Sequence, residues 1–378
     1  MFAVAWGANQ FVSTLVVYQS ERGLSIATGD GLYGIYAVAL IATMLLSGPA
    51  ADLWGRARFV RPALALSMLG SVLLMLGDHC VGLLFAGRFV AGVASGMVFA
   101  AGTAWVKELS ACAAAEAGPR RAAIALSAGF GAGPMATGVV AQWAPHPLVT
   151  AYMPHLIVSI AALPGVLWAP ETAGPAPSGA PGYAARLRVP AARRRRFLTV
   201  VVPAAPWVFA APSLAFAVQP ALLGDRVHGY AIVYSALIVA VTLGTGIAVQ
   251  PFARRLDRPD RTVGASAIGL ALIGAGALVA ALAIGQSDPW TAVVAAALLG
   301  GGYGLSLIGG LVETQRIAAP SELAGLTAVY YSLTYVGFVL PLMLAEAHAV
   351  AGYPTMLVAV AALIALSLAT SVHAASSA

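Results

Sequence analysis

Long apolar runs separated by short polar breaks extend along nearly the whole chain. Runs such as LIATMLLSG (40–48) and AVVAAALLG (292–300) lack the alternation of apolar and polar residues that marks a membrane β-barrel strand. Most runs are about twenty residues long, which is the length that crosses a bilayer as a helix. The pattern therefore predicts an all-α membrane protein with twelve transmembrane helices. We expect these spans at 1–18, 30–50, 60–77, 81–104, 121–143, 150–169, 197–219, 229–251, 262–285, 289–311, 324–345 and 352–373.

Composition agrees with this pattern and excludes a soluble globular protein. Hydrophobic residues make up 60% of the chain and charged residues 9%, whereas soluble domains contain about 25% charged residues. One stretch between the sixth and seventh spans is too rich in Pro and Gly to cross a membrane. We expect three parts, namely a six-helix bundle at 1–169, a cytoplasmic linker at 170–196 and a second six-helix bundle at 197–378.

The positive charges indicate the orientation in the membrane. If the first helix runs outward, 17 of the 20 Lys and Arg residues lie in loops on the cytoplasmic side. The positive-inside rule then predicts a multi-pass protein of the plasma (inner) membrane with both termini in the cytoplasm. The arginine run 193–196 is expected to contact anionic lipid or to fix the topology, and no nucleic-acid partner is expected.

The two halves of the chain share features at corresponding places. The second span of each half ends in an acid-and-arginine turn, ADLWGRAR (51–58) and ARRLDRPDR (253–261). The fourth span of each half ends at a glutamate, in AWVKELS (104–110) and GLVETQR (310–316). A parallel duplication of this kind is common in transporters that hold a substrate between two halves. We therefore expect the two bundles to be pseudo-symmetric.

Three motifs follow one another in the first half. The turn after the second span has the spacing Gly-x-x-x-Asp-x-x-Gly-Arg, the fourth span has an arginine followed by two glycines (RFVAGVASG), and the fifth span has GFGAGPMATG. Their residues are Gly48, Asp52, Gly55 and Arg56; Arg88, Gly92 and Gly96; and Gly129, Gly133, Pro134 and Gly138. With these motifs the whole chain resembles the major facilitator superfamily of transporters, and the third motif is similar to the pattern of its exporters. Leu53 replaces a usual arginine of the first motif, and Thr137 replaces a usual glycine of the third.

The resemblance implies that the turn at Asp52 is a cytoplasmic latch. In this family the acid faces the N-terminus of the eleventh span, here near 320–322, where free N–H groups and the helix dipole favour a carboxylate. We expect Gly48 to allow close helix contact and Gly55 to allow a positive φ. Asp257 is the counterpart in the second half. The alternative is a solvated loop whose arginines only fix the topology.

A buried charge in the fourth span requires a partner, because an isolated charge costs several kcal/mol at that depth. Arg88 is expected to bind carbonyl groups of the first span together with water, or else an anionic substrate or a carboxylate such as Asp30. Gly129, Gly133, Pro134 and Gly138 are expected to serve in gating, with ordinary small-residue packing as the alternative.

The resemblance also implies a substrate cavity lined by the first, fourth, seventh and tenth spans. Of the adjacent Asn9 and Gln10, we expect one to face it, because neighbouring positions on a helix point about 100° apart. The candidate cavity residues are Asn9, Gln10, Phe130, Trp207, Tyr303, Tyr330, Tyr331 and Tyr335. The candidate proton sites are Asp30 and Asp52, since no carboxylate lies in the middle of a span.

The leading hypothesis is a proton-coupled exporter of small amphipathic or hydrophobic molecules that works by alternating access. An uptake symporter or uniporter of a small metabolite and, more remotely, a non-transporting membrane sensor or scaffold are the alternatives. The sequence contains none of the HExxH, CxxC, Walker or GxSxG motifs, so we expect no enzyme activity, cofactor or metal. The expected partners are a small-molecule substrate, protons and the lipid bilayer, and the expected state is a monomer.

Overall fold

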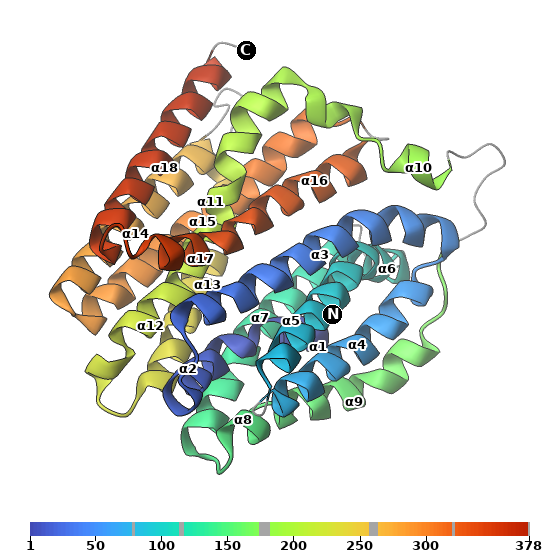
Figure 1. The fold of residues 1–378 in the computed structure, drawn as a ribbon. Coiled ribbons are helices and arrows are strands. Elements are labelled where there is room, and N and C mark those ends of the chain that lie inside the picture. Colours follow the sequence, from blue (N-terminus) through green and yellow to red (C-terminus); the bar gives the residue numbers. More distant parts are fainter. Residues whose placement is uncertain (78–79, 113–116, 174–181, 257–263, 320–321, 377–378) are drawn as a thin grey trace. The chain divides into compact units, whose positions relative to one another are not determined.

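The computed structural model describes residues 1–77, 80–112, 117–173, 182–256, 264–319 and 322–376, and nearly all of them are helical (Figure 1). Contacts divide the chain into two compact units. The first unit comprises Met1–Leu24 and Leu32–Arg188, and the second comprises Ser25–Gly31 and Val189–Ala378. The predicted boundaries of the bundles and the linker stay a prediction.

The first unit contains ten α-helices and one π-helical turn among its described residues. These are α1 (Phe2–Asn9), α2 (Phe11–Arg22), α3 (Ile26–Trp54, whose first turn belongs to the second unit), α4 (Ala57–Leu76), α5 (Val81–Met97), the π turn η1 (Val98–Gly102), α6 (Thr103–Leu109), α7 (Ala117–Trp143), α8 (Pro147–Thr150), α9 (Met153–Trp168) and α10 (Tyr183–Arg186).

The second unit has the same helical character over the residues described for it. Its elements are η2 (Pro190–Arg193), η3 (Phe197–Val201), α11 (Val202–Ser213), η4 (Leu214–Val218), α12 (Gln219–Leu223), η5 (Gly224–Val227), α13 (Ala231–Leu256), α14 (Gly264–Gln286), α15 (Pro289–Ile317), α16 (Leu323–Tyr335), η6 (Val336–Val339), α17 (Leu340–Ala347) and α18 (Tyr353–Ser376). Of these, η3 and η4 are π-helical and η2, η5 and η6 are 3₁₀-helical.

The predicted all-α membrane fold is confirmed. Within the described ranges, eleven helical runs are long and apolar enough to cross a membrane, and they follow the expected spans from the second to the twelfth. The expected first span is present as two consecutive helices, α1 and α2, which meet at Gln10. Gly23, at φ +63°, ends α2 in the left-handed conformation that closes many helices.

Close helix contacts at paired glycines appear in both units. In the first unit, α5 lies against α3 at Gly92 and Gly96, where an added Cβ would overlap the carbonyl oxygen of Tyr36 or lie 2.7 Å from that of Leu40. Small residues allow this approach because membrane helices associate mainly through van der Waals packing.

The corresponding helices of the second unit repeat the arrangement. An added Cβ at Gly300 or Gly304 of α15 would overlap the backbone of α13, at Thr242 and Gly246 respectively. In each unit, two glycines four residues apart on one helix (α5 or α15) thus allow close contact with a second helix (α3 or α13). This equivalence supports the internal repeat.

Candidate functional site

The turn between α3 and α4 is a compact charge cluster. Gly55 adopts φ +106°, a conformation that side chains other than glycine rarely accept. The Arg56 guanidinium forms an ion pair with Asp52 and donates from Nε and NH2 to Oε1 of Glu108 at 3.3 and 3.1 Å. Burial alone would lower the pKa of Arg56, but the bond to Glu108 and the charge of Asp52 raise it above its usual value.

Glu171, which follows α9, closes the start of α4. Its carboxylate accepts from the backbone N–H groups of Arg56 at 2.9 Å and Ala57 at 3.0 Å. A helix start leaves such N–H groups without helical partners and carries partial positive charge. The carboxylate also accepts from the N–H groups of Thr172 and Ala173. Burial raises the pKa of Glu171, but the four N–H donors together lower it below its ordinary value of 4.5.

Changing Glu171 to glutamine should expose the start of α4. We expect hydrogen exchange at the Arg56 and Ala57 amides to accelerate about fivefold at pH 7, as for ~1 kcal/mol at a solvent-screened carboxylate. Because folding depresses the pKa of Glu171, its contribution is present above pH 4.5 and is lost as the pH falls through the lower, folded value. Parent and variant should therefore converge in acid. Glu21→Gln, at the exposed end of α2, is the control, and unchanged exchange in Glu171→Gln would contradict the capping role.

The same turn holds the segment that contains α10. The Arg186 guanidinium lies 3.9 Å from the Asp52 carboxylate. The Tyr183 ring stacks on Trp54 with centroids 5.6 Å apart, and its hydroxyl donates to the Leu46 carbonyl at 3.2 Å. Asp52 therefore has partners inside its own unit.

Gly48 and Asp257 were also expected to belong to the latch. Gly48 does not mark a close helix contact, because among the described residues an added Cβ would meet only the Cβ of Ala100, at an ordinary 3.7 Å. That expectation was wrong: the helix has room for a methyl group there. Asp257, the expected counterpart of Asp52, lies outside the described residues.

Arg88 in α5 is 2% exposed and bonds to carbonyl groups. Its Nε donates to the carbonyl of Leu32 at 3.2 Å, and its NH1 donates to that of Ala8 at 3.0 Å. Ala8 lies in the last turn of α1, where carbonyls lack helical partners. The guanidinium also lies 4.9 Å from the ring centroid of Phe11 and 4.2 Å from that of Tyr36, within cation–π range. Among the described residues, no carboxylate pairs with Arg88.

The third motif forms the contact between α7 and α1. An added Cβ at Gly129 would overlap the carbonyl oxygen of Phe2, and one at Gly133 would lie 2.7 Å from that of Trp6. The two glycines, four residues apart, therefore let the two backbones touch.

Pro134 adds a polar bond to this contact. A proline at position 134 has no N–H for the carbonyl four residues earlier, which is that of Phe130. The side-chain amide of Asn9 donates to that carbonyl at 3.3 Å, and the Ser13 hydroxyl donates to the carbonyl of Pro134 at 2.8 Å. Asn9 thus satisfies a group that the proline frees. Gly138 is buried one turn further along α7.

Gln10 belongs to a buried polar network. It is fully buried, and its Nε2 donates to Ser71 Oγ at 2.7 Å. Ser71 Oγ lies 2.8 Å from Nδ1 of His155, whose Nε2 lies 3.1 Å from the carbonyl oxygen of Ala3. Because a carbonyl only accepts, Nε2 is assigned the proton and Nδ1 accepts from Ser71. The network joins α1 to α4 and α9.

In the second unit, aromatic side chains gather around Phe209 of α11. Its ring stacks on Tyr335 at 4.4 Å between centroids and lies 5.5 Å from Tyr303. Trp207, two residues earlier, donates from Nε1 to Ser367 Oγ of α18 at 2.9 Å. The expected cavity residues of this unit thus fall into an aromatic group and a tryptophan that bonds to the last helix.

Tyr330 and Tyr331 differ in their surroundings. Tyr330 is 1% exposed, and its hydroxyl donates to the carbonyl of Leu307 at 2.9 Å. Tyr331 is half-buried with its ring 5.7 Å from that of Tyr330. Tyr330 is therefore a core residue, which leaves Tyr331 as the better cavity candidate.

Two arginines of the run 193–196 form ion pairs inside the second unit. Arg196 pairs with Glu313, which is 3% exposed and lies 3.6 Å from Arg316, and Arg194 pairs with Glu322 at 2.8 Å. The glutamate at the end of the fourth helix therefore has an arginine partner in each unit.

Asp30 belongs to the short part of α3 that is grouped with the second unit. It is buried and interacts electrostatically with Tyr353 at the start of α18.

Comparison with known proteins identifies the family. The sequence profile described as Major Facilitator Superfamily matches residues 1–342. The chain belongs to the major facilitator superfamily. Solved structures similar to it in fold include a POT family transporter in complex with 5-aminolevulinic acid (TM-score 0.76, 11% identity, 100% of this chain and 95% of that one). The POT family transporter PepTSo (0.77, 12%, 100% and 96%) and the nucleoside transporter NupG (0.73, 12%, 99% and 96%) are also similar. No curated protein matches by sequence.

Membership in the major facilitator superfamily makes the protein a secondary transporter and a multi-pass integral membrane protein. Several polar residues of this superfamily member were not predicted as site residues. Glu108 and Glu313 were noted only as repeated glutamates, and that repeat was the signal for their paired role. Glu171 and His155 gave no such signal, because their partners lie far away in the sequence.

Proposed function

We propose that the protein is a proton-coupled exporter of small amphipathic or hydrophobic molecules, with both termini in the cytoplasm. The α1–α7 contact is the observation that supports this most. Gly129 and Gly133 bring the backbones together, and Asn9 bonds to the carbonyl freed by Pro134. The motif that resembles exporters is thus built into the packing of the first span.

We propose that Arg88 takes part in substrate or proton binding. Its guanidinium is buried among aromatic rings and carbonyls, and no described carboxylate neutralises it. A buried charge of this kind favours an anionic or strongly polar ligand. Asp30 and Asp52 stay the candidate proton sites, and Tyr303, Tyr331 and Tyr335 the candidate contacts for an amphipathic ligand.

Accumulation in everted membrane vesicles tests this proposal. With the vesicle interior acidified, we expect a fluorescent lipophilic dye such as ethidium to accumulate, and we expect an ionophore that collapses the pH gradient to release it. Equal dye accumulation with and without the pH gradient would contradict proton coupling.

An uptake symporter or uniporter is the second candidate. Solved structures that share the fold are described as a POT family transporter in complex with 5-aminolevulinic acid and a nucleoside transporter. Uptake of a small polar metabolite into right-side-out vesicles, without dye export, would favour this candidate. If neither the dye nor a polar metabolite is transported, the result would favour a sensor or scaffold.

The latch hypothesis predicts a shift in conformation when Asp52 becomes asparagine. A lost interaction with a helix N-terminus is worth about 0.3–1 kcal/mol, and up to ~2 if it is partly buried. The equilibrium should therefore move about two- to thirtyfold toward the inward-open state. Double electron–electron resonance between labels on the cytoplasmic ends of α3 and α16 measures this. Arg58→Gln, at an exposed position that forms no ion pair with Asp52 in the structure, is the control. An unchanged distance distribution in Asp52→Asn would contradict the latch hypothesis and would mean that the turn only fixes the membrane topology.

A further inference from the structure

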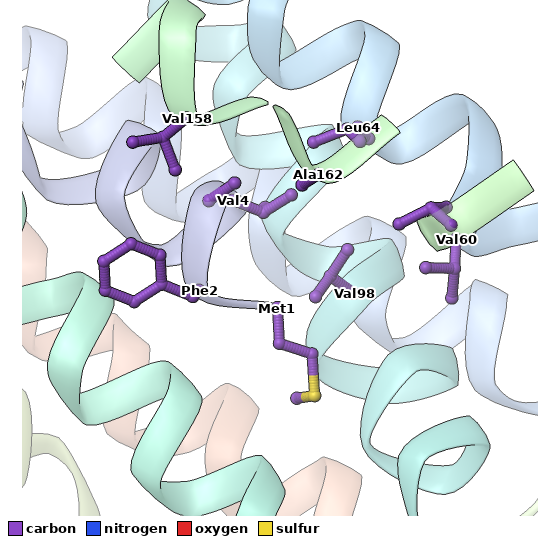
Figure 2. A pocket seen from close by; sticks show the side chains of 10 residues that line it. Met1, Phe2, Val4, Val60, Leu64, Val98, Val158 and Ala162 are labelled. Atoms are coloured by element: carbon purple, nitrogen blue, oxygen red, sulfur yellow. The ribbon is translucent and has the colours of Figure 1, made fainter. Parts of the chain in front are cut away.

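An apolar cavity of about 120 Å³ lies inside the first unit, among side chains of α1, α4, η1 and α9 (Figure 2). Val60 and Leu64 line it from α4, Val98 lines it from η1, and Val158 and Ala162 line it from α9. An apolar cavity of comparable size, about 150 Å³, stays free of water and binds small apolar molecules such as benzene. The space therefore suits a short hydrocarbon segment.

The cavity lies just beneath the lipid-facing surface of α9. Val158 and Ala162, four residues apart on the cavity side, are only partly buried, so the space is not sealed. On the same helix, Ile157 is 66% exposed and Ile160 is 57% exposed. In a membrane protein, such exposed apolar side chains face lipid. Hydrocarbon chains of the bilayer are thus the apolar molecules nearest to the cavity.

The helix α4, which lines the cavity with Val60 and Leu64, also carries a positive charge near its start. The NH2 of Arg61 donates to the carbonyl of Ala169 at 3.0 Å, and Ala169 packs against the same apolar cluster as Val60 and Leu64. Its buried Nε has no hydrogen-bond acceptor among the described residues, and a buried donor without an acceptor is costly. The described residues offer Arg61 no acidic partner. Glu171, just beyond α9, already accepts four N–H groups.

We propose that this is a binding site for an anionic phospholipid, with part of one acyl chain in the cavity and the phosphate at Arg61. The apolar space and the guanidinium on the helix that lines it match the two parts of such a lipid. Phosphate oxygens accept strong charge-assisted bonds from arginine, and basic pockets between transmembrane helices are suited to anionic headgroups. This site is independent of the direction of transport and of the transported substrate.

Photolabelling of the full chain in bilayer nanodiscs tests the acyl-chain position. The probe is phosphatidylglycerol with a diazirine in one acyl chain, and the expected labels fall on α4 and α9. Ala162→Trp should fill the cavity and reduce this labelling about tenfold, which corresponds to ~1.4 kcal/mol, or roughly two methylene groups. Ala161→Trp, on the exposed side of the same helix, should label like the parent.

The headgroup is tested with a matched pair of probes. Phosphatidylcholine with the same photoreactive chain should label the parent several-fold less than phosphatidylglycerol does. Arg61→Gln should remove this difference, whereas Arg58→Gln, which removes the same charge from an exposed position three residues earlier, should retain it.

Either of two results would overturn the proposal. Equal labelling of Ala162→Trp and Ala161→Trp would show that no acyl chain enters the cavity. Equal labelling of the parent by the two lipids would show that the site does not select an anionic headgroup. If the tryptophan variant is not recovered folded, Ala162→Leu against Ala161→Leu makes the same comparison with a smaller side chain.

Discussion

Arg88→Lys is expected to lower transport on the order of a hundredfold. The planar guanidinium donates to the carbonyls of Leu32 and Ala8 at once and lies against the ring of Tyr36. A lysine ammonium keeps the charge but loses the fork and the stacking. Each bond from a charged donor is worth about 1.5–3 kcal/mol, so the loss of one bond and the stacking amounts to ~2.8 kcal/mol.

Dye accumulation in everted vesicles measures this effect, normalised to the amount of folded protein by gel filtration. Arg58→Lys, the same change at an exposed arginine in the same unit, is the control and should be neutral. Near-normal transport by Arg88→Lys would show that only a generic positive charge is needed there.

Gly129→Ala is expected to destabilise the protein by about 1–3 kcal/mol, because overpacking of a tight contact forces the backbone to move. The new Cβ would overlap the carbonyl oxygen of Phe2 and push α1 away from α7. Thermal unfolding followed by tryptophan fluorescence should show a lower midpoint, and export should fall with it, since Asn9 could no longer reach Phe130.

Gly131 provides a matched control on the same helix. An added Cβ there meets nothing within 4 Å, so Gly131→Ala should be neutral or slightly stabilising through its higher helix propensity. If both alanine variants unfold at the same midpoint, the α1–α7 contact is looser than described and loses its importance for the exporter proposal.

Local sequence patterns predicted the helices well. The length of an apolar run predicts a membrane helix, because in lipid the backbone N–H and C=O groups must form hydrogen bonds with one another along the helix. Glycines four residues apart fall on one helix face, and small-residue packing was the stated alternative to gating for Gly129 and Gly133. The contacts of Gly92 and Gly96 became visible only in the structure.

Pairing between distant residues was not predictable in the same way. Glu171 reaches the start of α4 from 115 positions away, and nothing in its neighbourhood in the sequence indicates that role. His155 likewise bonds to groups of three helices that its neighbourhood in the sequence does not indicate. Gly48 shows the opposite error, because its place in a motif suggested a tight contact where only ordinary packing exists. The break of the first span at Gln10 likewise has no proline or glycine at that position to announce it.

The four consecutive arginines before η3 are not equivalent. Arg194 and Arg196 form ion pairs with Glu322 and Glu313, whereas the ion pairs found among the described residues include neither Arg193 nor Arg195. Tolerance to substitution should therefore alternate from one residue to the next, even though the total charge changes equally each time. In a mutational scan that scores membrane insertion, all four arginines should respond equally. In a scan that scores folding, only Arg194 and Arg196 should be sensitive. The total charge of the run therefore matters for membrane topology, and the position of each arginine in it matters for folding.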